Sequence, residues 1–365
     1  MKNKSLLIML LLITVSHAYS DTALNDDSVA QEITLAQQGN SDAQNQLGIR
    51  YFNGTGTEQN YAEAIKWFHK AAEQGHDAAQ SNLGIIYLHG MGTPENHILA
   101  KEWLQKSAEQ GYPQAQYNLA VMYLKGDGTD KDPVKAKAWF QQAAEKGYTE
   151  AQSQLGEMYL NGTGTLQNYT TALKWLQSPA EQGNGSAQFN LAVMYFEGLG
   201  TQQSYQDALL WFQKAAEQGN AAAQFNLGLM YQDGAGTPAD LLLAEEWYLK
   251  SAQQGHAPAQ SNLGLLYLQN PEKQNNRTAA MEWFQKAAEQ NYANAQYNLG
   301  MMYKNGDADV QDNVLAIKWF LKAAEQNHAS AQFNLGMMYQ NGDGVEKNEK
   351  VAQEWFQKAE QQKTK

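Results

Sequence analysis

The sequence predicts an all-α protein, a right-handed superhelical α/α solenoid of nine 36-residue helix-turn-helix repeats. Two residue types indicate this fold. Tyrosine recurs every 36 residues, at Tyr51, Tyr87, Tyr123, Tyr159, Tyr195, Tyr231, Tyr267, Tyr303 and Tyr339. All nine tryptophans of the chain keep the same spacing, from Trp67 to Trp355. Because two independent residue types follow one period, the pattern indicates an array of structural repeats.

The first half of each unit has the pattern of an amphipathic helix. In the unit at residues 185–220, apolar side chains recur at helical spacing, at Ala187, Leu191, Met194 and Tyr195. Gly198 and Gly200 follow. They are expected to end this helix, because glycine readily adopts the positive φ of a helix C-terminus.

The second half of each unit predicts a second helix. In the same unit its apolar stripe consists of Ala208, Trp211, Phe212, Ala215 and Ala216. The position of Ala192 in the first helix is Gly or Ala in every unit, which indicates that the two helices approach closely there. Helices of this length are not stable alone, so each must pack on its partner and on the adjacent hairpin.

The repeated motif resembles that of a known family. The run A-Q-x-N-L-G-x-M-Y-x-x-G-x-G-T, followed by A-x-x-W-F-x-K-A-A-E-Q-G, is similar to the Sel-one-like repeat (SLR), a relative of the tetratricopeptide repeat. The resemblance covers roughly residues 41–360. It implies a non-catalytic scaffold that holds partner proteins, and many bacterial members of the family are periplasmic or secreted.

Residues 1–18 have the pattern of a signal peptide. Lys2 and Lys4 precede an apolar run at residues 6–15, and Ser16-His17-Ala18 fits a cleavage site. The run is too short to span a bilayer; a retained membrane anchor is the alternative. No cysteine follows it to carry a lipid. We therefore expect a mature chain that begins at Tyr19, has no membrane contact after cleavage, and is periplasmic or secreted.

The rest of the chain divides into two parts. Residues 19–40 are expected to hold a disordered segment and an N-terminal capping helix, because residues 28–39 align with the second half of a unit. Residues 41–365 are expected to form the nine repeats with a polar C-terminal cap, in which residues 360–363 replace apolar repeat positions. Polar caps suit the ends of a solenoid.

Composition excludes several function classes. The net charge is −12, so nucleic acid is a poor partner for this chain. The chain has no cysteine, which excludes thiol catalysis and thiolate metal sites. The histidines lack an H-E-x-x-H context, and the glycine-rich turns lack the lysine of a phosphate-binding loop. We therefore predict no enzyme activity, no cofactor and no metal.

The candidate binding residues lie on the face of the first helix that points away from the second helix. In tetratricopeptide arrays the equivalent positions line a concave groove. Here they predict partner contacts at Tyr117, Phe189, Asn190, Phe225, Asn226, Tyr297 and Phe333. The rings would anchor apolar side chains and the amides would bond a peptide backbone. The alternative is that rings and amides pack between adjacent hairpins.

The leading functional hypothesis is an exported, non-enzymatic scaffold that binds a protein or an extended peptide in its groove. Family resemblance suggests an alternative, a periplasmic immunity protein that neutralises a secreted effector such as a phospholipase. The acidic surface would suit a basic toxin. A weak β-lactamase-like enzyme is a third hypothesis, and the absence of cysteine and of an S-x-x-K motif argues against it.

Overall fold

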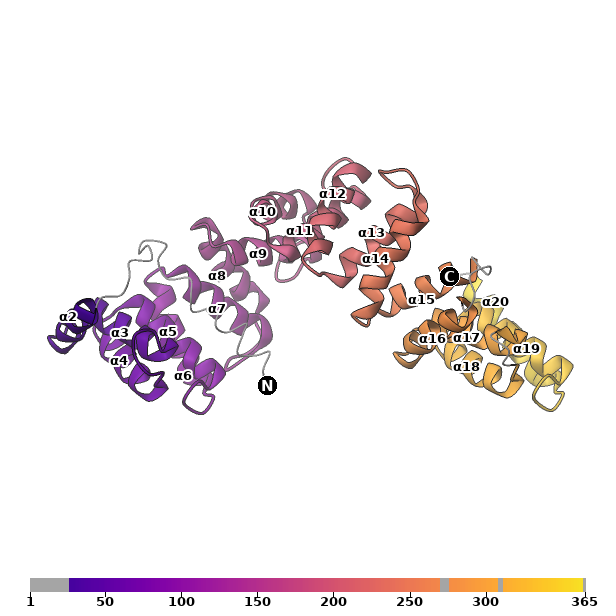
Figure 1. The fold of residues 1–365 in the computed structure, drawn as a ribbon, viewed down its shortest axis with the longest axis horizontal. Coiled ribbons are helices and arrows are strands. Elements are labelled where there is room, and N and C mark those ends of the chain that lie inside the picture. The colour runs from indigo at the N-terminus through magenta and orange to yellow at the C-terminus, as the bar shows by residue number, and fades with distance from the viewer. Residues whose placement is uncertain (1–25, 270–275, 308–310, 364–365) are drawn as a thin grey trace. The chain divides into compact units, whose positions relative to one another are not determined.

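The computed structural model describes residues 26–269, 276–307 and 311–363. These residues form nineteen α-helices and no strand, in the order shown in Figure 1. The prediction of an all-α fold with nine repeats of 36 residues is confirmed. The expected signal peptide, residues 1–18, lies outside the described residues.

Each repeat is a helical hairpin. The first helices are α3 (Ser41–Asn53), α5 (Asp77–His89), α7 (Pro113–Lys125), α9 (Thr149–Asn161), α11 (Gly185–Glu197), α13 (Ala221–Asp233), α15 (Ala257–Gln269), α17 (Ala293–Asn305) and α19 (Ala329–Asn341). The second helices are α4 (Tyr61–Glu73), α6 (His97–Glu109), α8 (Pro133–Glu145), α10 (Tyr169–Glu181), α12 (Tyr205–Glu217), α14 (Leu241–Gln253), α16 (Asn276–Glu289), α18 (Asn313–Glu325) and α20 (Glu349–Lys363).

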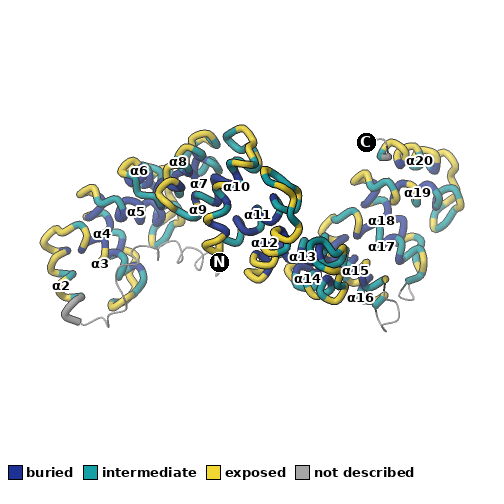
Figure 2. The backbone as a smooth tube through the Cα atoms, turned by 90° about the horizontal axis from the view of Figure 1, so that it is seen from above, coloured by how far each residue is buried: buried dark blue, intermediate teal, exposed yellow. Residues whose placement is uncertain are grey.

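The helices form two compact units, one within residues 1–187 and one within residues 188–365. The first unit begins with α2 (Asp26–Gln37), which packs through Ile33 and the buried Ala36 against Leu47 of α3. In Figure 2 the loops between helices are largely exposed, and the buried residues follow the helix sides that meet a neighbour. The core of each unit is therefore a row of small apolar clusters rather than one central core.

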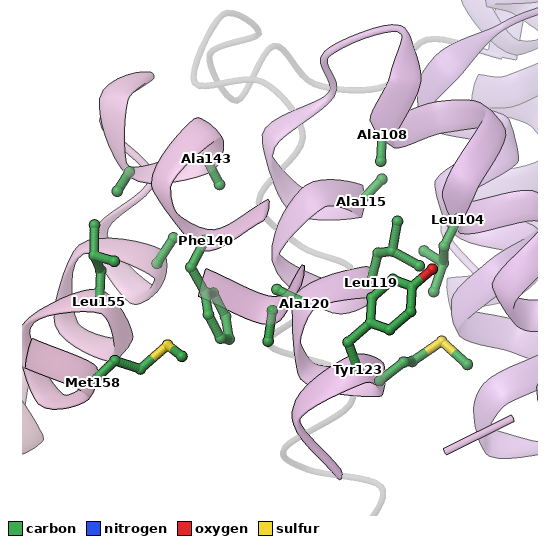
Figure 3. Packing of buried hydrophobic residues seen from close by; sticks show 14 of the residues in the cluster. Leu104, Ala108, Ala115, Leu119, Ala120, Tyr123, Phe140, Ala143, Leu155 and Met158 are labelled. Carbon is green, nitrogen blue, oxygen red and sulfur yellow. The ribbon is translucent and has the colours of Figure 1, made fainter. Parts of the chain in front are cut away.

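Close approach of the two helices in a hairpin explains the small residue at the position of Ala192. In the first unit a Cβ added to Gly84 would lie 2.4 Å from Cγ of Leu104. In the second unit a Cβ on Gly228 would lie 2.6 Å from Cδ1 of Tyr248. Figure 3 shows the same packing in repeat three, where Ala120 faces the ring of Phe140. The large residue of the second helix thus occupies the space that the small residue leaves.

The turn inside each hairpin depends on glycine for two separate reasons. In repeat six Gly234 ends α13 with a left-handed φ of 71°, and its N–H donates to the carbonyl of Met230. Gly236 also has positive φ, and a Cβ there would lie 2.5 Å from the carbonyl oxygen of Tyr205 in repeat five. The second glycine therefore lets the loops of adjacent repeats touch.

Candidate partner-binding site

The aromatic residues at the predicted groove position each pack on a ring of their own hairpin's second helix. The ring centroids lie 5.4 to 5.9 Å apart in five pairs: Tyr117–Phe140, Phe189–Phe212, Phe225–Tyr248, Tyr297–Phe320 and Phe333–Phe356. One side of every predicted ring is therefore used in intramolecular packing.

In three repeats a second ring covers the same aromatic residue. This ring belongs to the connector between one repeat and the next. Tyr148 lies 5.4 Å from Tyr117, His256 lies 5.1 Å from Phe225, and His328 stacks on Tyr297 at 4.7 Å. Tyr117, Phe225 and Tyr297 are accordingly half-buried. In these three repeats the connector ring covers part of the predicted ring and leaves less of it available to a partner.

Phe333 is the most exposed of the predicted rings. In repeat nine the connector position equivalent to His328 is Thr364, which is not aromatic. Thr364 lies outside the described residues. Phe333 is 51% exposed, more than any other aromatic residue among the exposed large hydrophobic side chains. Phe189, whose connector residue is Asn220, is half-buried.

A cavity of about 570 Å³ lies beside Phe333. Tyr297, Phe333 and Phe356 supply aromatic walls, and Asn334 and Glu360 supply polar groups. Glu360 is the one charged residue in the lining. The structure therefore brings two of the predicted residues, Tyr297 and Phe333, together at one concave site.

The other predicted residues do not line this cavity. Phe189, Asn190, Phe225 and Asn226 lie on α11 and α13 of the second unit, and each of them is half-buried. Tyr117 lies on α7 in the first unit. Asn334 and Phe356 were not predicted. Asn334 could have been found, because it occupies the same repeat position as Asn190 and Asn226.

Two asparagine amides at this repeat position, the predicted Asn226 and the unpredicted Asn334, take part in local hydrogen bonds. Nδ2 of Asn226 donates to the carbonyl of Ala222, one turn earlier in the same helix, at 2.8 Å. Oδ1 of Asn334 accepts from Nζ of Lys304 in the preceding repeat at 3.0 Å. An amide that is bonded in this way has fewer free donors and acceptors for a peptide backbone.

A ladder of glutamines joins the repeats, and the prediction missed it. Within α13, Nε2 of Gln224 donates to the carbonyl of Ala216 in repeat five at 3.0 Å. Its Oε1 accepts from Nε2 of Gln254 at 2.7 Å. Equivalent side-chain bonds of 2.7 to 2.8 Å join Gln74 to Gln44, Gln110 to Gln80, Gln218 to Gln188, Gln290 to Gln260 and Gln326 to Gln296.

The signal for this ladder was present in the sequence. The position of Gln224 is glutamine in all nine repeats, and the position of Gln254 is glutamine in eight. A buried amide must be hydrogen-bonded, which explains why one residue type recurs at each position. Only Lys146, in repeat three, departs from the pattern.

Three titratable rings at the predicted positions and their connectors, His256, His328 and Tyr117, favour their neutral forms. Burial lowers the pKa of His256 and of His328 below 6.5. Nδ1 of His328 accepts the N–H of Ala331 at 3.2 Å, which also requires an unprotonated nitrogen. Burial, aided by the charge of Glu150, raises the pKa of Tyr117. These three rings are therefore uncharged at neutral pH.

Metal-binding clusters and membrane-spanning helices are both absent from the described residues. In the three described ranges, no group of three or more His, Cys, Asp or Glu side chains is placed to hold a metal ion. Over the same ranges, no helix combines the length and apolar character needed to cross a membrane.

Comparison with known proteins gives one family and several related structures. The model of the Sel1 repeat matches nine consecutive segments at residues 41–76, 77–112, 113–148, 149–184, 185–220, 221–256, 257–292, 293–328 and 329–363. No curated protein matches the chain.

Two solved structures are similar over most of the chain. One is c5321, described as a protective antigen present in uropathogenic Escherichia coli strains displaying an SLR fold. It is 38% identical with a TM-score of 0.83, and the match covers 91% of this chain and 71% of that one. The other is a Sel1 repeat protein from Oxalobacter formigenes, 30% identical with a TM-score of 0.63, covering 91% of this chain and 99% of that one.

A third solved structure is the immunity protein Pa5087 from Pseudomonas aeruginosa. It is 22% identical with a TM-score of 0.37, and the match covers 58% of this chain and 81% of that one. A likeness at this level does not transfer the role of that protein to this chain.

Proposed function

We propose that this chain, which belongs to the Sel1 repeat family, is an exported, non-enzymatic scaffold that binds a protein or an extended peptide. Sel1 repeats typically mediate protein–protein interactions. We place the main anchor of the partner in the cavity beside Phe333. The partner's contribution there is an apolar side chain with a cation next to it.

The observation that carries this proposal is the combination of exposure and concavity at Phe333. The ring is 51% exposed and lines a cavity of about 570 Å³. Small-molecule and anchor sites have volumes of about 300–1,000 Å³, mostly apolar walls and a few polar groups. Aromatic side chains in such pockets are frequent hot spots of protein interfaces. The carboxylate of Glu360 gives the site its preference for a cation.

The remaining predicted residues are secondary contacts in this proposal. Phe225 and Asn226 would extend the contact along the second unit, and Phe189 and Asn190 occupy the equivalent positions on α11. Tyr117 would contact a partner in the first unit. Because one side of each ring already packs on a second helix, each contributes less new contact area than Phe333.

Export is supported by the sequence at the N-terminus. Lys2 and Lys4, the apolar run at residues 6–15 and Ser16-His17-Ala18 have the order of a signal peptide. The proposed location is therefore periplasmic or secreted. N-terminal sequencing of the protein from the periplasmic and culture fractions should give Tyr19 as the first residue. A protein that keeps Met1 and stays in the cytosol would contradict export.

The binding proposal is tested with Phe333→Ser. Serine occupies the same repeat position at Ser81, Ser153 and Ser261, so the fold should tolerate it. The tagged protein and its variant are used to capture partners from a periplasmic extract, and the affinity for each captured protein is then measured. Loss of an aromatic hot spot should weaken binding by about 2 kcal/mol or more.

The matched control is Val314→Ser, which changes a 65% exposed apolar residue of α18 outside the cavity. This control should bind like the unchanged protein. If Phe333→Ser binds every captured protein with full affinity, the cavity is not the anchor. A captured enzyme whose activity the protein inhibits would instead support the immunity hypothesis.

A further inference from the structure

In seven of the nine repeats the tryptophan of the second helix has a lysine ammonium over its ring. The lysine follows the tryptophan by three residues, and its Nζ lies 3.9 to 4.3 Å from the ring centroid. Tryptophan is the aromatic side chain that attracts cations most strongly. This lysine is thus a built-in ammonium ligand of the tryptophan, repeated along the array.

Repeat three exchanges this lysine with a member of the glutamine ladder. The usual order is lysine followed four residues later by glutamine, as in Lys106 and Gln110 of repeat two. Repeat three has Gln142 and Lys146 instead. Among the described residues no lysine or arginine lies over Trp139.

The exchange changes the hydrogen bonds around the ring. Oε1 of Gln142 accepts a hydrogen bond from Nε2 of Gln116 at 3.2 Å. Nζ of Lys146 donates to the carbonyl of Gly111. Oε1 of Gln116 is buried and has no hydrogen-bond partner, whereas Gln110 supplies a donor to the equivalent Gln80 at 2.7 Å.

A cavity of about 410 Å³ lies at the place of the exchange. It is lined by Trp139, Gln116 and Gln142, by the acidic residues Glu109 and Glu145, and by Lys146. One oxygen of each carboxylate accepts from a glutamine of its own helix, which leaves the other oxygen for a ligand. The lysine ammonium is already bonded to a backbone carbonyl. Two carboxylates against one such ammonium disfavour an anionic ligand and favour a cationic one.

We propose that the cavity beside Trp139 binds a primary alkylammonium group, which takes the place that the repeat's own lysine fills elsewhere. The ammonium lies over the Trp139 ring and between Glu109 and Glu145. Its three N–H donors can bond a carboxylate and, after a small movement of Gln142, the buried Oε1 of Gln116. This site lies in the first unit and is independent of the cavity beside Phe333.

The proposal is tested by titration with n-butylammonium. The protein is labelled with nitrogen-15 at its tryptophan indoles, and the signal of Trp139 is assigned with Trp139→Phe. The Trp139 signal should shift in a saturable way with a millimolar dissociation constant, while the signals of the seven tryptophans that have a lysine over the ring stay in place. Uncharged n-butanol should leave all nine signals unchanged. Equal shifts with n-butanol, or no shift with n-butylammonium, would overturn the proposal.

Two variants separate this site from non-specific binding. Gln142→Lys restores the repeat pattern and places an internal ammonium over Trp139, so it should weaken the binding of n-butylammonium at least tenfold. The converse exchange, Lys106→Gln with Gln110→Lys, should create a second site at Trp103. Repeat two is suited to this test because Glu73 and Glu109 occupy the positions of Glu109 and Glu145.

The outcomes of these variants are decisive even if one of them folds poorly. Undiminished binding by Gln142→Lys would show that the ammonium does not use the face of Trp139, and the proposal would be wrong. The same conclusion follows if the repeat-two exchange, folded by circular dichroism, gains no shift at Trp103. Comparison of a capped Gly-Lys-Gly peptide with spermidine then shows whether the natural ammonium is a partner's lysine or a free polyamine.

Discussion

Repeats eight (residues 293–328) and nine (residues 329–363) have almost the same first helix but different surroundings. Their sequences are ANAQYNLGMMYKN and ASAQFNLGMMYQN. In repeat eight Tyr297 is covered by His328, and Oε1 of Gln296 accepts from Gln326. In repeat nine Phe333 is 51% exposed.

This comparison shows that the same repeat position can be covered or exposed, and we propose that the exposed ring serves recognition. The connector residue that follows the hairpin also differs, since it is His328 in repeat eight and Thr364 in repeat nine. The ring of His328 covers Tyr297, whereas Phe333 remains exposed on the wall of the cavity. The four predictions below test this contrast, and they run from the largest expected effect to the smallest.

The largest effect is expected at the tryptophans. Trp319 of repeat eight is 6% exposed and packs in a cluster with Phe284 and Leu299, whereas Trp355 of repeat nine is half-buried. Replacing a buried tryptophan by alanine typically costs about 3–5 kcal/mol. Trp319→Ala should fall in that range and Trp355→Ala below it, as measured by chemical denaturation. Equal losses at the two sites would contradict the contrast in packing.

The second prediction concerns the two groove rings. Tyr297→Ser removes ring contacts to both Phe320 and His328, and should cost about 2 kcal/mol of unfolding free energy. Phe333→Ser removes only the contact to Phe356 and should cost about 1 kcal/mol or less. Thermal melts of the two variants check this order. A larger loss for Phe333→Ser would mean that its ring is a packing residue, against its proposed role.

The third prediction concerns the glutamine ladder. Gln326→Ala leaves the buried Oε1 of Gln296 without its donor, and an unsatisfied buried acceptor costs about 1–3 kcal/mol. Gln362 occupies the same position in repeat nine, but it donates to Asn327 at 3.4 Å, and Oε1 of Gln332 has no partner. Gln362→Ala should therefore leave the denaturation midpoint almost unchanged. A comparable drop of the midpoint in both variants would show that the hydrogen bond from Gln326 to Gln296 is not the cause of the lost stability.

The repeat fold could be predicted from the sequence because each helix pattern occurs nine times. Nine copies of Ala187, Leu191 and Trp211 make the helices and the hairpin evident without any knowledge of tertiary contacts. The close approach at Gly228 was predicted for the same reason, since a small residue recurs at that position.

The candidate site was harder to predict because it depends on contacts between different helices. A helical wheel places Phe225 on the outer face of α13, but it does not show that His256, 31 residues later, lies over the ring. The cavity beside Phe333 likewise combines residues of α17, α19 and α20. Binding at the seven predicted residues stays a prediction, and the structure gives Phe333 priority among them.

The smallest effect is expected from His328→Asn, which changes the connector itself. Nδ1 of His328 accepts the N–H of Ala331 and caps α19. Asparagine performs the same capping at Asn40 and Asn220, so the variant should keep the cap while it removes the ring over Tyr297. At neutral pH its stability should fall by about 1 kcal/mol or less, because the stacking contact to Tyr297 is lost while the N-terminal hydrogen bond of α19 is retained.

The two proteins should differ in their response to acid. Burial lowers the pKa of His328 in the folded state below its ordinary value of 6.5, so the unfolded chain binds this proton more readily. The stability that depends on neutral His328 is therefore complete above about pH 6.5 and decreases as the pH falls from there toward the folded pKa. The free energy of unfolding is measured between about pH 7.5 and 5, a range that brackets the ordinary pKa of histidine. Over this range it should fall more for the unchanged protein than for His328→Asn. Because His256 and the other histidines are present in both, the difference isolates His328. Identical pH profiles would show that His328 binds a proton equally well in the folded and unfolded states. Burial of its ring against Tyr297 would then have no electrostatic cost.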